Sequence, residues 1–496
     1  MFDIIVTASD GTDSTDQSVA ITVTDVDEAP PVVVSNLVDI TFLTDDEGII
    51  LTGDSSGDGV TALSVSAAGD VNGDGFDDFI IGFSLVADGV GQAIVVFGEA
   101  EASGLDLSSL TPDQGFSIQS GEAYDLFGDS VSSAGDVNGD GFDDLIISAY
   151  YSGGGNAYVV FGGDINSDVD VLNLTPSQGF VIEGDSSSGA LGTSVSSAGD
   201  VNGDGFDDLI VGDPIIDTNG LNSGEAYVIF GGETNSDVDV SNLTADQGFT
   251  ILAAASGDVL GQSVSAAGDV NGDGFDDIIV GAPFVDNEGE STTGASYVIF
   301  GGSDSNSIDL SNLTPELGFV LEVVQDPDSL TFIGPLGIAV SSAGDVNGDG
   351  FDDVIVGANN ILISEFITGA AFVVFGDDTA SNINVANLTT DQGFAIVSDA
   401  LGDYAGGSVA SAGDVNGDGF DDLIVGAPFG DDGGDDAGEA YVIFGGENIT
   451  DIELSNLTAA QGFIIQGDVS GDAAGFSVSS AGDVNGDGFD LSLIHI

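Results

Sequence analysis

The chain has 496 residues, of which 86 are Asp or Glu and one is His, while Lys, Arg and Cys do not occur. A formal charge of −86 leaves no basic patch for nucleic acid or an anionic membrane surface, which excludes both as partners. The lack of cysteine excludes disulfides and thiolate metal sites, and no apolar run reaches the roughly 18 residues of a membrane span.

Residues 1–30 have the pattern of a β-hairpin. Phe2–Ala8 and Ser18–Thr24 are strand-like runs separated by a polar, turn-forming segment. Since an isolated hairpin is only marginally stable, we expect the end of a larger β-sandwich. The segment, with its acidic end before Pro30, resembles the C-terminal part of a cadherin-like repeat; the alternative is a stray hairpin with an acidic linker. No signal-peptide pattern follows Met1, so we expect this start to lie inside a domain, and residues 31–44 to form a linker.

A ten-residue acidic motif recurs along the rest of the chain. It reads GDVNGDGFDD at Gly69–Asp78 and five further times, and a seventh copy begins at Gly482 and ends at Asp490. The leading aspartates are 64 to 76 residues apart, a period typical of stacked structural repeats. Each unit holds four short runs rich in Val, Ile, Phe and Tyr, which favours strands over helices. Four strands per unit predict the blades of a β-propeller over residues 45–490.

Both ends of the repeat region bear on how the ring closes. Glu47–Gly53 (EGIILTG) matches the outer-strand segment Gln178–Gly184 (QGFVIEG), yet no blade precedes it. We therefore expect this N-terminal strand to complete the last blade, which gives seven blades. Residues 491–496 (LSLIHI) match no repeat, and we interpret them as a truncation or sequence artefact in which His495 has no function. Two strands of the last blade are then missing, which predicts a gap or a frayed apolar edge.

The expected fold class is therefore all-β. It comprises a seven-bladed β-propeller of four-stranded blades, with the last blade truncated, and a short N-terminal β-sandwich fragment.

The acidic motif offers oxygen atoms at alternate positions. Counted from its first aspartate, side chains at positions 1, 3, 5 and 9 and the backbone carbonyl at position 7 can converge, and the glycine at position 6 permits the sharp bend. Ca²⁺ accepts about six to eight such oxygens, and the lack of nitrogen or sulfur ligands argues against zinc, copper or nickel.

The sequence thus predicts about six calcium sites and a weaker seventh, in which Leu491 stands at position 9. The predicted ligands are Asp70, Asn72, Asp74, Phe76 and Asp78; Asp136, Asn138, Asp140, Phe142 and Asp144; Asp200, Asn202, Asp204, Phe206 and Asp208; Asp269, Asn271, Asp273, Phe275 and Asp277; Asp345, Asn347, Asp349, Phe351 and Asp353; Asp414, Asn416, Asp418, Phe420 and Asp422; and Asp483, Asn485 and Asp487.

Two other interpretations of the motif are weaker. An EF-hand needs an acidic residue at position 12 and flanking helices, whereas Ile81 stands there and both flanks are strand-like. An acidic turn without metal would leave so much unpaired charge in each of six loops that a cation is favoured.

Two longer segments are similar to a known family. FGDSVSSAGDVNGDGFDD (Phe127–Asp144) and LIVGAP (Leu423–Pro428) resemble the FG-GAP repeat of integrin alpha-chain propellers, and Gly-Ala-Pro departs to Gly-Asp-Pro at Gly212–Pro214. The resemblance implies a seven-bladed propeller whose acidic loops join the first and second strands of each blade on one face. It also implies that loops on the opposite face recognise the partner, and variable segments such as Asp213–Ser223 and Pro283–Thr293 fall there.

These features predict a calcium-stabilised extracellular or cell-surface module for binding or adhesion, with a protein or glycan partner at a cell surface or matrix. The alternatives are glycan binding without catalysis, or a polysaccharide-degrading enzyme that uses a pair of carboxylates. Because the conspicuous aspartates recur identically in every unit, no pair stands out as catalytic, and we predict a protein that is not an enzyme.

Overall fold

The structure is a computed structural model. It describes residues 4–8, 37–39, 48–52, 64–84, 90–99, 105–151, 153–163, 167–185, 189–286, 293–303, 306–324, 331–363, 366–379, 381–398, 402–431, 433–467 and 469–495. In this part of the chain no helix is long and apolar enough to cross a membrane.

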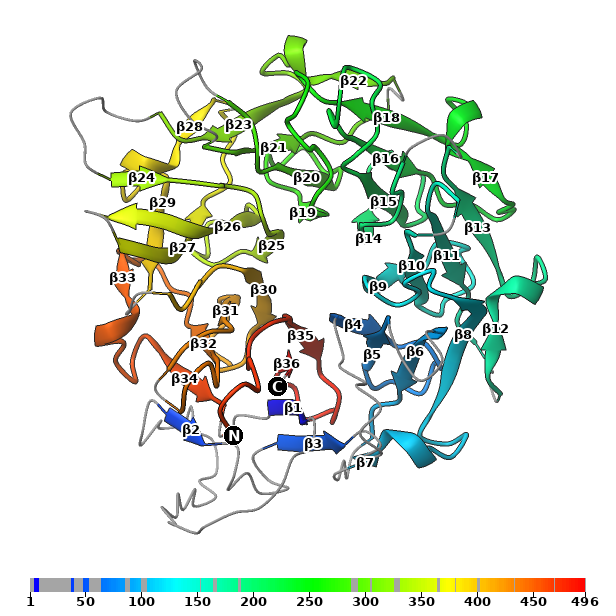
Figure 1. The fold of residues 1–496 in the computed structure, drawn as a ribbon, viewed down its shortest axis with the longest axis horizontal. Helices are drawn as coiled ribbons and strands as arrows, with labels where there is room; N and C mark the ends of the chain where they lie inside the picture. The colour runs from blue at the N-terminus through cyan, green and yellow to red at the C-terminus, as the bar shows by residue number, and fades with distance from the viewer. Residues whose placement is uncertain are drawn as a thin grey trace.

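Seven β-sheets stand around a central axis as the blades of a propeller (Figure 1). The first blade consists of β4 (Ser64–Gly69), β5 (Asp78–Phe83), β6 (Val90–Val96) and β8 (Gly115–Ala123), which pair antiparallel in this order. The first strand of each blade faces the axis and contacts the first strands of its neighbours, from β4 round to β35 and back. The expected propeller of four-stranded blades is confirmed.

The next five blades repeat this order. The second has β9 (Val131–Gly135), β10 (Asp144–Ala149), β11 (Asn156–Val160) and β13 (Gly179–Glu183); the third β14 (Ser194–Gly199), β15 (Asp208–Asp213), β16 (Glu225–Ile229) and β18 (Gly248–Leu252); the fourth β19 (Val264–Gly268), β20 (Asp277–Ala282), β21 (Ala295–Ile299) and β23 (Gly318–Glu322); the fifth β25 (Val340–Gly344), β26 (Asp353–Ile363), β27 (Phe366–Val374) and β29 (Gly393–Val397), with β24 (Thr331–Ile333) also paired to β26; and the sixth β30 (Ser408–Gly413), β31 (Asp422–Ala427), β32 (Glu439–Ile443) and β34 (Gly462–Gln466).

A short fifth strand links each blade to the next. It lies between the third and fourth strands of one blade and pairs parallel with the fourth strand of the preceding blade, as β12 (Val169–Asp170) does with β8. A 3-10 turn follows it in blades one to six. The other such strands are β7 (Leu105–Asp106), β17 (Val238–Asp239), β22 (Ile308–Asp309), β28 (Ile383–Asn384) and β33 (Ile452–Glu453), and the turns are η3 (Leu107–Ser109), η4 (Val171–Asn173), η5 (Val240–Asn242), η6 (Leu310–Asn312), η7 (Val385–Asn387) and η8 (Leu454–Asn456).

The repeat begins earlier in the chain than residue 45. β2 (Leu37–Asp39) pairs parallel with β34 of the sixth blade, in the position that β12 and its equivalents take elsewhere. Leu37–Asp39 therefore belongs to the propeller rather than to a linker. The rest of residues 31–44 lies outside the described residues.

The seventh blade joins the two ends of the described chain. Its order is β35 (Val478–Gly482), β36 (Leu491–His495), β1 (Ile4–Ala8) and β3 (Gly48–Thr52), and it appears in Figure 1 as red strands beside blue ones. β3 takes the outer position, so the expected closure by the N-terminal strand is confirmed. β1 occupies the third position, but it runs parallel to both neighbours, whereas the third strands of the other blades are antiparallel to theirs.

Two expectations for this blade are corrected. Leu491–His495 forms its second strand: Ile494 is buried opposite Val478, as Val211 is opposite Val195, and Leu491 is buried in the place of the position-9 aspartate. Because β36 and β1 fill the second and third positions, the sheet has no gap in the strands that the structure describes. The separate β-sandwich at residues 1–30 stays a prediction: β1 lies in the propeller, and the other expected strand, Ser18–Thr24, lies outside the described residues.

The hydrophobic core lies between neighbouring blades. The second strands of the first, second, third, fourth and sixth blades are buried along their whole length. One face of β15, with Leu209 and Val211, packs with Val159 and Ile182 of the second blade, and similar clusters fill the other junctions. Because the sheets are covered on both faces, each second strand reads as a nearly continuous apolar run.

Candidate metal-binding loops

The acidic motifs form the loops between the first and second strands of the blades. Position 1 directly follows the first strand, and position 9 begins the second strand, as Asp70 and Asp78 do around β4 and β5. Since all blades repeat the same strand directions, the seven loops lie on one face of the ring. The expected loop positions are confirmed.

The carboxylate at position 1 organises each turn. In the first loop, Asp70 Oδ1 accepts hydrogen bonds from the amides of Gly73 at 2.7 Å and Asp74 at 3.0 Å, and Oδ2 accepts one from Gly75 at 2.9 Å. The hydrogen bonds that the amides of positions 5 and 6 donate to the position-1 carboxylate recur in all six remaining loops. Gly75 has a φ of 92°, which favours glycine, and the bend lets successive amides point at one carboxylate.

Position 5 is exposed, position 3 is half-buried or, at Asn416, buried, and both fold back on the same turn. Asn72 Oδ1 accepts from Asp74 N at 2.8 Å, and Asp74 Oδ1 accepts from Phe76 N at 3.1 Å. In the second, third and sixth loops the position-3 amide instead donates to the carboxylate at position 9, as Asn138 does to Asp144 at 3.3 Å. The asparagine at position 3 thus has two hydrogen-bonding arrangements among the loops, and only in one of them does its oxygen accept from the amide of position 5.

Position 9 is buried and fixes the loop to the third strand. Asp78 has no exposed surface; its Oδ2 accepts from Val71 N at 3.0 Å and its Oδ1 from Gly98 N, just after β6, at 2.8 Å. Burial raises the pKa of Asp78 to about 8, the Gly98 and Val71 amides oppose the rise, and the charges of Asp74 and Asp70 add to it. The pKa values of Asp144, Asp208, Asp277, Asp353 and Asp422 are raised to about 8 for the same main reason.

A further functional position was missed by the sequence reasoning. Position 8 links each loop to its neighbour: Asp143 Oδ2 accepts from Asp70 N of the preceding blade at 2.8 Å. The same bond, 2.7–2.9 Å long, joins all seven loops and closes the ring from Asp483 N to Asp77. The available signal was that this aspartate persists in the seventh motif, as Asp490, where position 9 is lost.

Position 7 also acts between blades. A Cβ atom on Gly73, at position 4, would overlap the ring of Phe142 from the next blade. Each phenylalanine therefore packs on the bare backbone of the neighbouring turn, which explains why glycine and phenylalanine repeat together. A role for its backbone carbonyl as a metal ligand stays a prediction.

The donor chemistry fits a hard cation. Each full loop offers only oxygen donors, and three carboxylates at positions 1, 5 and 9 lie close enough that two of them raise the pKa of the third. Within the described residues no three acidic or histidine side chains already converge as a metal centre. Joint coordination by positions 1, 3, 5, 7 and 9 therefore stays a prediction.

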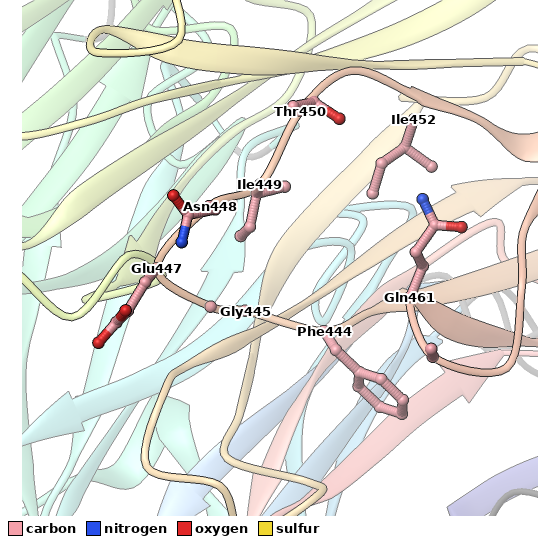
Figure 2. Close-up of a pocket in the computed structure, with 10 residues that line it drawn as sticks. Phe444, Gly445, Glu447, Asn448, Ile449, Thr450, Ile452 and Gln461 are labelled. Carbon is pink, nitrogen blue, oxygen red and sulfur yellow. The ribbon is translucent and has the colours of Figure 1, made fainter.

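One pocket of about 230 Å³ lies beside the sixth loop, between β32 and β33 (Figure 2). It is lined by Phe444, Gly445, Gly446, Glu447, Asn448, Ile449, Thr450, Ile452, Ala460 and Gln461. Glu447 is its one ionisable side chain, and it points away from Gln461 and Ile452. Since general acid–base hydrolysis of a glycoside uses two carboxyl groups, this pocket does not supply that pair.

Comparison with known proteins agrees with the repeat architecture. The FG-GAP repeat model matches residues 127–161, 191–229, 260–299, 337–360 and 405–443. The chain is 30% identical over 258 residues to integrin alpha pat-2 of Caenorhabditis briggsae, and 31% identical over 231 residues to integrin alpha-5 of Xenopus laevis. These matches cover 47% and 44% of the chain, and 18% and 20% of the relatives.

A further relative carries the name of an enzyme. The chain is 32% identical over 204 residues to phosphatidylinositol-glycan-specific phospholipase D of Bos taurus, which covers 40% of the chain and 22% of that protein. The chain thus spans about a fifth of the length of each of these curated relatives.

Proposed function

The chain is an FG-GAP repeat protein with an integrin-alpha-like propeller, and from that premise we propose that it is a calcium-stabilised extracellular module for binding or adhesion. The observation that carries the proposal is the sixfold repetition of one loop geometry. Six loops hold carboxylates at positions 1, 5 and 9 within mutual electrostatic reach, in a chain with no Lys or Arg to offset them.

Calcium would supply positive charge and oxygen coordination within these loops. The residues that would hold it are those at positions 1, 3, 5, 7 and 9, Asp70 to Asp78 in the first loop. The chain's own contribution is to orient them: the amides of residues 73–75 hold the first carboxylate, and the Val71 and Gly98 amides hold the ninth. Since three carboxylates repel one another in an ion-free loop, a divalent cation stabilises the folded state.

The extracellular location rests on two lines of support. Extracellular calcium modules work at about 10⁻⁴–10⁻³ M calcium, a concentration that the cytosol does not offer. The relatives that are named integrin alpha belong to a class of cell-surface adhesion receptors. We propose the same setting for this chain.

Recognition is proposed for the face opposite the acidic loops. Second strands end on that face, and an exposed apolar side chain follows the strand end in blades two, three, four and six: Tyr151, Ile215, Phe284 and Phe429. Repetition of such side chains on one face of a rigid ring suits binding of a protein, or of a glycan at a cell surface or matrix.

Catalysis is not part of the proposal. The relative named as a phospholipase D shares a match that spans 22% of its length, so its activity is not carried over to this chain.

The proposal is tested by titrating calcium into the whole chain and counting bound ions by equilibrium dialysis. We expect six sites that saturate by about 10⁻³ M, and a seventh that is weaker. Failure to bind calcium at that concentration would contradict the metal part. Protein and glycan arrays, probed with calcium and with chelator, then separate protein adhesion from glycan binding; binding to neither class would contradict the recognition part.

A further inference from the structure

Two buried carboxylates lie at the junction of the second and third blades, away from the acidic loops. Asp213 ends β15 and Glu225 begins β16, and the two residues stand directly opposite each other in the antiparallel ladder. Asp213 has no exposed surface and Glu225 is 4% exposed. Since directly opposed residues share one face of a sheet, two like charges are placed side by side, which is destabilising.

The hydrogen bonds at this pair leave one oxygen unsatisfied. Asp213 Oδ1 accepts from Ala190 N at 2.8 Å, and Glu225 Oε2 accepts from the Tyr227 hydroxyl at 2.5 Å. Asp213 Oδ2 is buried and meets no donor in the described ranges with the geometry of a hydrogen bond. Burial raises the pKa of Asp213 to about 6, the Ala190, Ile215 and Ile216 amides oppose the rise, and the charge of Glu225 adds to it. A buried carboxylate oxygen without a partner costs free energy on the order of a lost charged hydrogen bond, unless an ion meets it.

More oxygen atoms surround the unsatisfied one. A Cβ atom on Gly189 would overlap Asp213 Oδ2 and would lie 3.2 Å from the carbonyl oxygen of Gly154, so both oxygens lie beside the bare backbone of this glycine. The pKa of Tyr227 is raised first by burial and then by the charges of Glu225, Asp213 and Asp185.

The other blades show that the fold does not need this pair. The residue equivalent to Asp213 is Phe or Ala in blades one, two, four, five and six: Phe83, Ala149, Ala282, Ala358 and Ala427. The sixth blade keeps Glu439 and Tyr441, with the tyrosine hydroxyl donating to the glutamate, but Gln466 Nε2 also donates to Glu439 at 3.4 Å. Only the third blade sets two acids against each other among these equivalent pairs.

We propose that Asp213 and Glu225 bind a divalent cation, with the Gly154 carbonyl as a further oxygen donor. Two carboxylates balance the charge of one such ion, and an all-oxygen donor set suits calcium rather than zinc. The site lies on the face opposite the acidic loops, at the start of the variable segment Asp213–Ser223. Its ion fixes the position where that segment leaves β15, on the proposed recognition face.

The site is independent of the calcium loops and is tested apart from them. Tb³⁺ occupies calcium sites and emits when a nearby excited tyrosine transfers energy to it. Tyr227 donates directly to Glu225, whereas the acidic loops contain phenylalanine and no tyrosine. Titration of the whole chain with Tb³⁺, under tyrosine excitation, is expected to give emission that calcium displaces.

Matched variants locate the emission. Asp213→Ala copies the residue of the sixth blade and is expected to fold. It should abolish the Tb³⁺ emission because a ligand is lost. Tyr227→Phe should abolish the emission because the energy donor is lost. Glu439→Gln and Tyr441→Phe change the equivalent pair of the sixth blade, and Asp269→Asn changes an acidic loop; all three should keep the emission.

Emission that survives Asp213→Ala, or no emission from the unchanged chain, would overturn the inference. The second result would indicate a pair that shares a proton instead of binding an ion. Neither result bears on the acidic loops, whose ions are counted by dialysis of the Asp213→Ala variant, which lacks this site.

Discussion

The sixth and seventh acidic loops are identical at positions 1 to 8 and differ at position 9, where Asp422 is replaced by Leu491. Both loops keep the aspartate that accepts from the preceding blade: Asp421 at 2.8 Å and Asp490 at 2.9 Å. The ring therefore closes through the seventh blade although its buried carboxylate is missing. The motif thus combines two separable roles, a bond between blades at position 8 and an anionic site completed at position 9.

The largest expected effect is on the pH dependence of stability without calcium. Six position-9 carboxylates have their pKa raised to about 8, above the unfolded value near 4. A raised folded pKa gives stability that is present below the unfolded pKa and is lost as pH rises through the folded pKa. In chelator, the unfolding temperature should therefore fall between pH 5 and pH 8, and saturating calcium should remove most of that slope.

Circular dichroism at a series of pH values measures this slope. An unfolding temperature in chelator that rises from pH 5 to pH 8 would contradict the account of position 9.

The next largest effect on stability is expected when the residues at position 9 are exchanged between the sixth and seventh loops. Asp422→Leu copies the seventh loop and removes the carboxylate that accepts from the amides of Val415 and Gly445, at a cost of about 3 kcal/mol in calcium. Leu491→Asp should add a calcium site, so the stability of this variant should depend more steeply on calcium. Denaturant unfolding with and without calcium measures both variants. If their stabilities depended on calcium to the same degree, the proposal that position 9 completes the calcium site would be contradicted.

Removal of the aspartate at position 8 should have equal effects in the two loops. Asp421→Ala and Asp490→Ala each delete one charged acceptor of a backbone amide, at a cost of about 2 kcal/mol. This cost should be the same with calcium and with chelator, because position 8 lies outside the proposed ligand set. A loss in only one of the loops, in the same denaturant experiment, would refute a shared role.

The smallest expected effects separate two glycines of one turn. Gly350 has a φ of 93° and open space around a Cβ, so Gly350→Ala should cost about 1 kcal/mol, from backbone strain alone. Gly348→Ala should cost more, because its methyl group would also displace Phe420 of the next blade. Equal losses in thermal unfolding would argue against the phenylalanine contact.

The repeat made most of the fold predictable from sequence. Periodic apolar runs located the four strands of each blade, and the match between Glu47–Gly53 and Gln178–Gly184 predicted the strand that closes the ring. These features depend on a local sequence pattern that recurs in each blade. The position of the acidic loops between the first two strands followed from the family resemblance.

Contacts between distant segments could not be predicted in this way. β1 and β36 pair although they lie at opposite ends of the sequence, and the repeat pattern does not predict a third strand that runs parallel to both of its neighbours. Leu37–Asp39 resembled a linker because the Asn-Leu-Thr signal of the other blades does not follow it. The position-8 bond joins different repeats, so spacing within one motif gives no sign of it.

The central claim, that the acidic loops are calcium sites that stabilise the ring, is tested most directly by thermal unfolding of the whole chain at pH 7.5. The scan is made in calcium, in chelator, and in chelator with magnesium. The account predicts a higher unfolding temperature in calcium than in either other condition, because the ion binds the folded loops and Mg²⁺ needs a stricter octahedron. An unfolding temperature that is the same in calcium and in chelator would contradict it.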